Sequence, residues 1–156
     1  MASTIKNLVE ISGLADSLPQ NPTVFKQFTV QETLVLLDAK PDIEQIVKVI
    51  AQVVITSTRV IKTPVGRSLE GQILSGFKII VQGEVTQKIE YVADECTKSV
   101  HSAHFDVPFS TFIVLPSCYE IGTPVLVNAY IEDLYVDLID KRTISKNVIL
   151  FLDATT

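Results

Sequence analysis

The chain has 156 residues, of which 47% are hydrophobic and 20% are charged, so it has the size and composition of one globular domain with a buried core. Its formal net charge is −5 and its 13 Lys and Arg residues are scattered, which argues against nucleic acid as a partner. No apolar run approaches the roughly 18 residues of a bilayer span, and the amino terminus lacks the apolar core of a secretory signal. We therefore expect cytoplasmic synthesis and no membrane span.

Residues 1–24 are set apart from the rest of the chain as an amino-terminal arm, with one domain over 25–156. Within the arm, Gly13 and Pro19 limit the length of any helix. A short helical stripe is one interpretation, and it would contain Ile5, Leu8, Val9 and Ile11. The others are a loosely docked tail and a segment that donates a strand to the sheet edge of a neighbouring subunit.

The remainder alternates apolar and polar residues with the period of two that is typical of strands. The alternation is clearest over Val47–Ile55 and Ile73–Val85. Asp42 is expected to cap a short helical turn just before the first of these segments. The apolar phase slips after Ile55, which predicts a bulge or strong twist near Ser57, and Gly83 predicts a bend. Further strands are expected over 25–37, 100–107, 109–115, 125–138 and 144–152.

Short strands at this spacing predict an all-β fold in which two antiparallel sheets pack face to face as a β-sandwich. Turn residues separate the strands. They include Pro64-Val65-Gly66, Gly122-Thr123-Pro124 and Asp140-Lys141-Arg142.

Histidine and cysteine side chains give no sign of a metal or catalytic site. His101 and His104 lie on a predicted strand, where odd and even positions face opposite ways, so we expect a partly buried, hydrogen-bonded pair and no metal. Cys96 and Cys118 are too few for a disulfide framework and lack metal-site spacing. No nucleophile, base and orienting group come together in the sequence. We therefore expect a protein that is not an enzyme and has no cofactor.

Several segments of the chain resemble the SPOCS domain of endospore-forming bacteria. The similarity is carried by Val60–Gly66, Ser68–Gly76, Lys88–Asp94, Ser99–Pro116, Lys40–Ile46 (KPDIEQI) and Ala129–Asp133 (AYIED). The resemblance implies a short, stand-alone protein of the spore envelope that is made in the mother cell and deposited in the spore coat or on the outer spore surface. Larger members of this family carry a peptidoglycan-binding LysM module and contact a coat-morphogenetic ATPase, and this chain has no room for such a module.

We therefore expect a structural or adaptor protein that acts through contacts with its own copies, or with spore-coat proteins such as the coat-morphogenetic ATPase. Self-assembly into a layer or filament is favoured because one small domain has few ways to bridge two different partners. A glycan- or peptidoglycan-binding module is the alternative, although the chain has no Trp and four Tyr.

Candidate contact residues lie in the hairpin that resembles the family and in the AYIED segment. Those of the hairpin are Lys62, Thr63, Arg67, Ser68 and Glu70, chosen because loops on a rigid sandwich are frequent contact surfaces. Glu132 and Asp133 are chosen because they fall in the AYIED segment that resembles the family. Cys96 and Cys118 are expected to be free thiols in a reducing cytosol and are candidates for an intermolecular cross-link in an oxidised spore layer.

Overall fold

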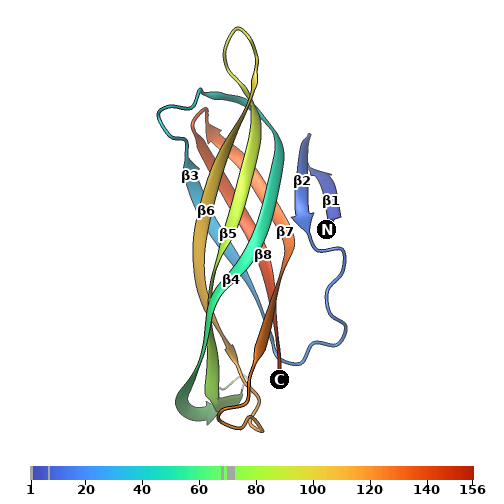
Figure 1. Cartoon of the computed structure of the whole chain (residues 1–156), viewed down its shortest axis with the longest axis vertical. Coiled ribbons are helices and arrows are strands. Elements are labelled where there is room, and N and C mark those ends of the chain that lie inside the picture. Colours follow the sequence, from blue (N-terminus) through green and yellow to red (C-terminus); the bar gives the residue numbers. More distant parts are fainter. Residues whose placement is uncertain (1, 7, 68, 70–72) are drawn as a thin grey trace.

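The computed structural model describes residues 2–6, 8–67, 69 and 73–156, and the secondary structure in these ranges is all strand. The strands are β1 (Ala2–Lys6), β2 (Val9–Leu14), β3 (Phe25–Val35), β4 (Ile43–Arg67), β5 (Ile73–Ala93), β6 (Val100–Val114), β7 (Leu126–Asp140) and β8 (Thr143–Thr155). They form a five-stranded sheet in the order β1-β2-β4-β5-β6 and a three-stranded sheet in the order β3-β8-β7. Every pairing is antiparallel except that of β2 with β4. The predicted two-sheet, mostly antiparallel all-β fold is confirmed (Figure 1).

The core lies between the two sheets, where the inward-facing positions of the central strands are apolar. Alternate residues of β8 are fully buried, including Ile144, Val148 and Leu150. On the facing sheet, Val85 and Ile89 of β5 are also 0% exposed. Strand β4 lies along β7 on one side of the sandwich and β3 lies along β6 on the other. The two sheets therefore enclose a long, continuous core with β5 and β8 at its centre.

The predicted irregularity near Ser57 is present as a shift of register between Ile55 and Ser57 in the pairing of β4 with β5. Gly83 lies opposite Ile55 at this point. A Cβ on Gly83 would lie 2.5 Å from the Val54 carbonyl oxygen and 2.7 Å from the Phe109 ring. The glycine is therefore needed because backbone and an aromatic ring approach it closely at the bulge.

Several local expectations differ from the structure. The turn expected at Pro64-Val65-Gly66 lies within β4, which continues to Arg67, and the strands expected over 100–107 and 109–115 are one strand, β6. One of the three interpretations of the arm and the expected turn after Asp42 are also wrong. The arm forms β1 and β2 rather than a helical stripe, and β2 pairs in parallel with β4 through Glu10–Ser12 and Lys48–Ile50. No helical turn follows Asp42, because β4 begins at Ile43. The Asp42 carboxylate accepts a hydrogen bond from Arg142 Nη1 at 2.8 Å instead of capping a helix.

Candidate interaction surface

One long edge of the five-stranded sheet is partly open. Strand β2 pairs with β4 only at Lys48–Ile50. From Gln52 to Arg67 the outer edge of β4 has no strand partner among the residues that the structure describes. The N–H and C=O groups along such an edge are a template for pairing with a further strand.

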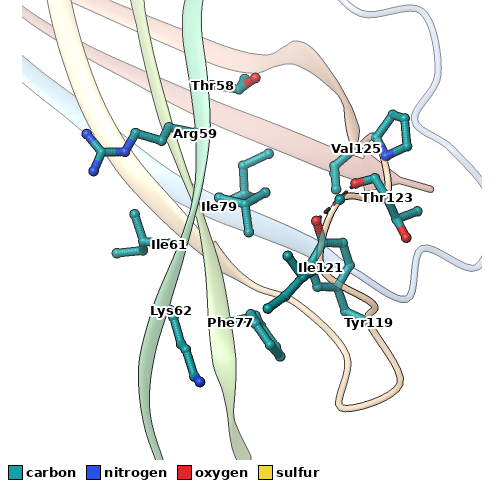
Figure 2. Close-up of a pocket in the computed structure, with 13 residues that line it drawn as sticks. Thr58, Arg59, Ile61, Lys62, Phe77, Ile79, Tyr119, Ile121, Thr123 and Val125 are labelled. Atoms are coloured by element: carbon teal, nitrogen blue, oxygen red, sulfur yellow. Dashed lines mark hydrogen bonds between the residues drawn. The ribbon is translucent and has the colours of Figure 1, made fainter.

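An apolar pocket of about 470 Å³ lies beside this open edge. Its walls come from residues 58–62 of β4, from Phe77 and Ile79 of β5, and from the loop that joins β6 to β7. Figure 2 shows the side chains of Phe77, Ile79, Tyr119 and Ile121 gathered on one side of the β4 ribbon. Arg59 and Ile61 lie on the other side of that ribbon, which follows from the alternation of side chains along a strand.

The loop between β6 and β7 is fixed by local bonds, so the pocket is present before any ligand binds. The Leu115 amide donates to the Phe77 carbonyl oxygen at 3.0 Å, which ties the start of the loop to β5. The Tyr119 hydroxyl donates to the Thr123 carbonyl oxygen at 2.9 Å. The rings of Phe77 and Tyr119 meet edge to face with centroids 5.4 Å apart, an arrangement favoured by their quadrupoles.

Ile121 marks the rim of the pocket. Its side chain is 76% exposed, although the buried Tyr119 nearby is only 9% exposed. Lys62 also lines the pocket and is exposed. The site therefore offers an apolar hollow, a projecting apolar side chain and the positive charge of Lys62 next to an open strand edge, and this combination suits an extended peptide segment.

The predicted contact residues are only partly brought together. Lys62 lines the pocket, Thr63 is half-buried, and Arg67 is exposed at the end of β4. The hydroxyl oxygen of Thr63 is buried and has no hydrogen-bond partner among the described residues. Ser68 and Glu70 lie outside the described residues.

Glu132 and Asp133 lie on the other sheet, at a shift of register in β7 between Ile131 and Asp133. Glu132 accepts a hydrogen bond from Gln27 Nε2 of β3, and Asp133 Oδ1 accepts one from the Leu134 amide at 2.8 Å. The first of these bonds links β3 to β7 across the three-stranded sheet, and the second is local to β7 at the bulge. The two acidic residues therefore do not belong to the pocket surface that includes Lys62.

Cys96 and Cys118 are both exposed and unpaired. Cys96 lies in the loop before β6 and Cys118 in the loop after it, at opposite ends of the molecule (Figure 1). Strand β6 has 15 residues, which corresponds to a length of about 45 Å. A disulfide requires Cα atoms within about 7 Å, so these thiols cannot pair within one chain.

The two histidines have different surroundings. His101 is half-buried, stacks on Tyr91 with ring centroids 6.0 Å apart, and has its Nε2 atom 3.0 Å from Ser99 Oγ. His104 is exposed, so the expected partly buried pair is wrong for this residue. Within the described ranges, no three His, Cys, Asp or Glu side chains are grouped to hold a metal ion.

Two features of the site region and core were missed in the sequence. Arg142 holds the segment before β4 by donating to the carbonyl oxygens of Lys40 at 2.9 Å and Leu37 at 2.8 Å. Lys146 of β8 is 0% exposed and points into the core, and its Nζ atom has no hydrogen-bond partner among the described residues. Burial lowers the pKa of Lys146 from 10.5 to about 8, although the charge of Glu32 acts in the opposite direction.

The chain was compared with known protein families, curated proteins and solved structures. A family model described as "SipL, SPOCS domain" matches residues 42–139, which is well over half of the chain. The match runs from the start of β4 into the end of β7 and includes the open edge and the pocket. No curated protein and no solved structure matches the chain. The part of the chain that the structure describes has no helix of the length and apolarity needed to cross a membrane.

Proposed function

Because the chain belongs to the SPOCS-domain family of sporulation-related proteins, we propose that it is a non-enzymatic building block of the spore envelope. It acts through protein–protein contacts and assembles with its own copies into a layer or filament in the coat or on the outer spore surface. The observation that carries this proposal is the apolar pocket beside the unpaired edge of β4.

An added strand would engage both parts of this surface. Its backbone would pair with the edge of β4 from Gln52 onward, and alternate side chains would face the pocket. Backbone pairing supplies affinity that depends little on sequence, while the hollow formed by Phe77, Tyr119 and Ile121 selects an apolar side chain. Contact with a different coat protein, including the coat-morphogenetic ATPase, would use the same features.

Replacing Ile121 by Glu is expected to raise the concentration required for assembly at least tenfold, because it places a charge at the rim of an apolar contact. The loss of a well-buried apolar anchor is typically worth more than 1 kcal/mol of binding free energy, and tenfold corresponds to about 1.4 kcal/mol. Light scattering of the purified variants over a concentration series measures the effect.

Ile139→Glu is the matched control for Ile121→Glu. Ile139 is also an exposed isoleucine, at 59%, but it lies near the end of β7 and does not line the pocket. Equal loss of assembly in both variants would contradict the pocket as the contact site. Binding of peptidoglycan by a monomeric protein, lost in Ile121→Glu, would instead support a glycan-binding module.

Mild oxidation of assembled protein is expected to give a ladder of covalent oligomers, because the two exposed thiols lie at opposite ends of each copy. The single variants Cys96→Ser and Cys118→Ser should stop at covalent dimers, since each retains one thiol. Non-reducing gel electrophoresis separates these results. A wild-type protein that stays monomeric on the gel while it is assembled in solution would contradict a cross-linking role for the cysteines.

A further inference from the structure

Strand β2 fills the gap between the two sheets on the side where β4 and β7 meet. It pairs with Lys48–Ile50 of β4, and directly after it the Ala15 amide donates to the Ile131 carbonyl oxygen of β7 at 2.9 Å. Ile11 is 1% exposed and Leu14 is 8% exposed, and both belong to the main core. The core is therefore incomplete on this side without β2.

The gap between β4 and β7 that β2 fills, called the slot below, is specific for the sequence of this arm. Gly13 has a φ of +110°, and a Cβ at this position would lie 1.9 Å from the Ala51 carbonyl oxygen. Only glycine fits such a conformation and such a close approach. An occupant therefore needs two apolar residues in the positions of Ile11 and Leu14 with a glycine directly before the second.

The arm is held less firmly than the other strands of the sandwich. Strand β2 has three paired positions on β4, whereas β3 has eleven paired positions on β8. Segments with few contacts open at the lowest free energies. The ten residues from 15 to 24 that join β2 to β3 have a maximum reach of about 33 Å, and they contain Pro19 and Pro22. Figure 1 shows this connection running along the outside of the sandwich.

We propose that in the assembled protein β2 of one copy occupies the slot between β4 and β7 of the next copy. This inference rests on the proposed self-assembly and adds a second contact between copies, at Lys48–Ile50 of β4, which is separate from the pocket and the open edge from Gln52 to Arg67. A second copy is the occupant because its arm supplies Ile11, Gly13 and Leu14 in the required order. The exchange preserves the contacts of β2 with β4 and β7, including the 3.9 Å approach of Lys48 Nζ to Glu10 Oε1, so it has little enthalpic cost.

Such an exchange extends an assembly because each copy gives one arm and accepts one arm. A rotation that does not close then generates an open chain of copies. Exchange between copies competes with the closed form, in which the tethered arm has an effective concentration on the order of millimolar. The open chain is therefore favoured where copies are concentrated, as in a packed layer.

Two single-cysteine proteins test the exchange directly. Glu10→Cys and Lys48→Cys are made separately in the Cys96→Ser, Cys118→Ser background, because Glu10 and Lys48 are register partners on β2 and β4. The two proteins are mixed in equal amounts, allowed to assemble and then oxidised. A covalent heterodimer at least fivefold above the control mixture is expected. The control pairs Glu10→Cys with Thr29→Cys, an exposed position on β3.

The outcomes separate this inference from the proposed function. If light scattering shows assemblies but the heterodimer does not exceed the control, arm exchange is overturned while self-assembly stands. A variant with both cysteines in one chain should then form an intrachain disulfide in the assembled state. If the protein stays monomeric at every concentration, both the proposed self-assembly and the arm exchange are overturned.

Discussion

Replacing Lys146 by Met is expected to raise the free energy of unfolding at pH 7 by about 2–3 kcal/mol. The side chain is 0% exposed, and burial lowers its pKa from 10.5 to about 8. A difference of one pKa unit corresponds to about 1.4 kcal/mol between the two protonation states. Methionine has a similar length and no charge, and replacing buried charged groups by apolar ones is often stabilising.

The same substitution should remove most of the dependence of the free energy of unfolding on pH above pH 7. In the folded protein the pKa of Lys146 is depressed, so the unfolded chain binds more protons between pH 8 and 10.5. The penalty for charging the buried amine is therefore fully present below about pH 8 and shrinks as the pH rises through this window. Wild-type protein should gain stability from pH 7 to 9.5, and Lys146→Met should gain much less.

Urea unfolding at pH 7 and pH 9.5 measures both effects. Lys62→Met is the control, because Lys62 is exposed and exposed substitutions usually change stability by less than about 0.5 kcal/mol. A destabilised Lys146→Met variant would contradict this expectation, since it would mean that the amine makes a stabilising interaction in the core.

Replacing Gly13 by Val is expected to release the arm from the sandwich. A β-branched residue at a φ of +110° is strained, and its Cβ would collide with the Ala51 carbonyl oxygen. Release of β2 from the slot would expose Ile11 and Leu14. Burial of each such side chain contributes about 1.5–3 kcal/mol to the free energy of folding. Hydrogen exchange of the amides in residues 9–14 should become at least a hundredfold faster, while β5 and β8 stay protected.

Ser12→Val is the matched control for Gly13→Val. It places the same side chain on the neighbouring residue of β2, whose backbone φ is not positive. Unchanged exchange protection of residues 9–14 in Gly13→Val would contradict the assignment of β2 to this slot. Equal loss of protection in both variants would show that the added bulk, and not the glycine conformation, is responsible.

The regular part of the fold could be predicted from sequence because each strand carries its own alternation. The slip of phase between Ile55 and Val60 even located the bulge opposite Gly83. The arm could not be assigned in the same way, because its apolar spacing fits a helix as well as a strand and β4 decides between them. Asp42 was misread for a similar reason, since its partner Arg142 is 100 residues away.

The pocket could be predicted only in part. Lys62 was found because a turn was predicted beside it in the segment that resembles the family, although β4 continues there to Arg67. Tyr119 and Ile121 were missed because a loop brings them to β5 in space, although an isoleucine directly before Gly122-Thr123-Pro124 was a signal of an exposed apolar residue. Lys146 was also visible in the sequence, because it shares the parity of the buried Ile144 and Val148.

The mass of the purified protein in solution, measured by light scattering over a wide concentration range, tests the central claim most directly. We predict multimers that grow with concentration and appear as layers or filaments by electron microscopy. A protein that lacks residues 1–24 should form multimers with fewer copies at each concentration. Monomers at every concentration, with or without oxidant, would contradict the account.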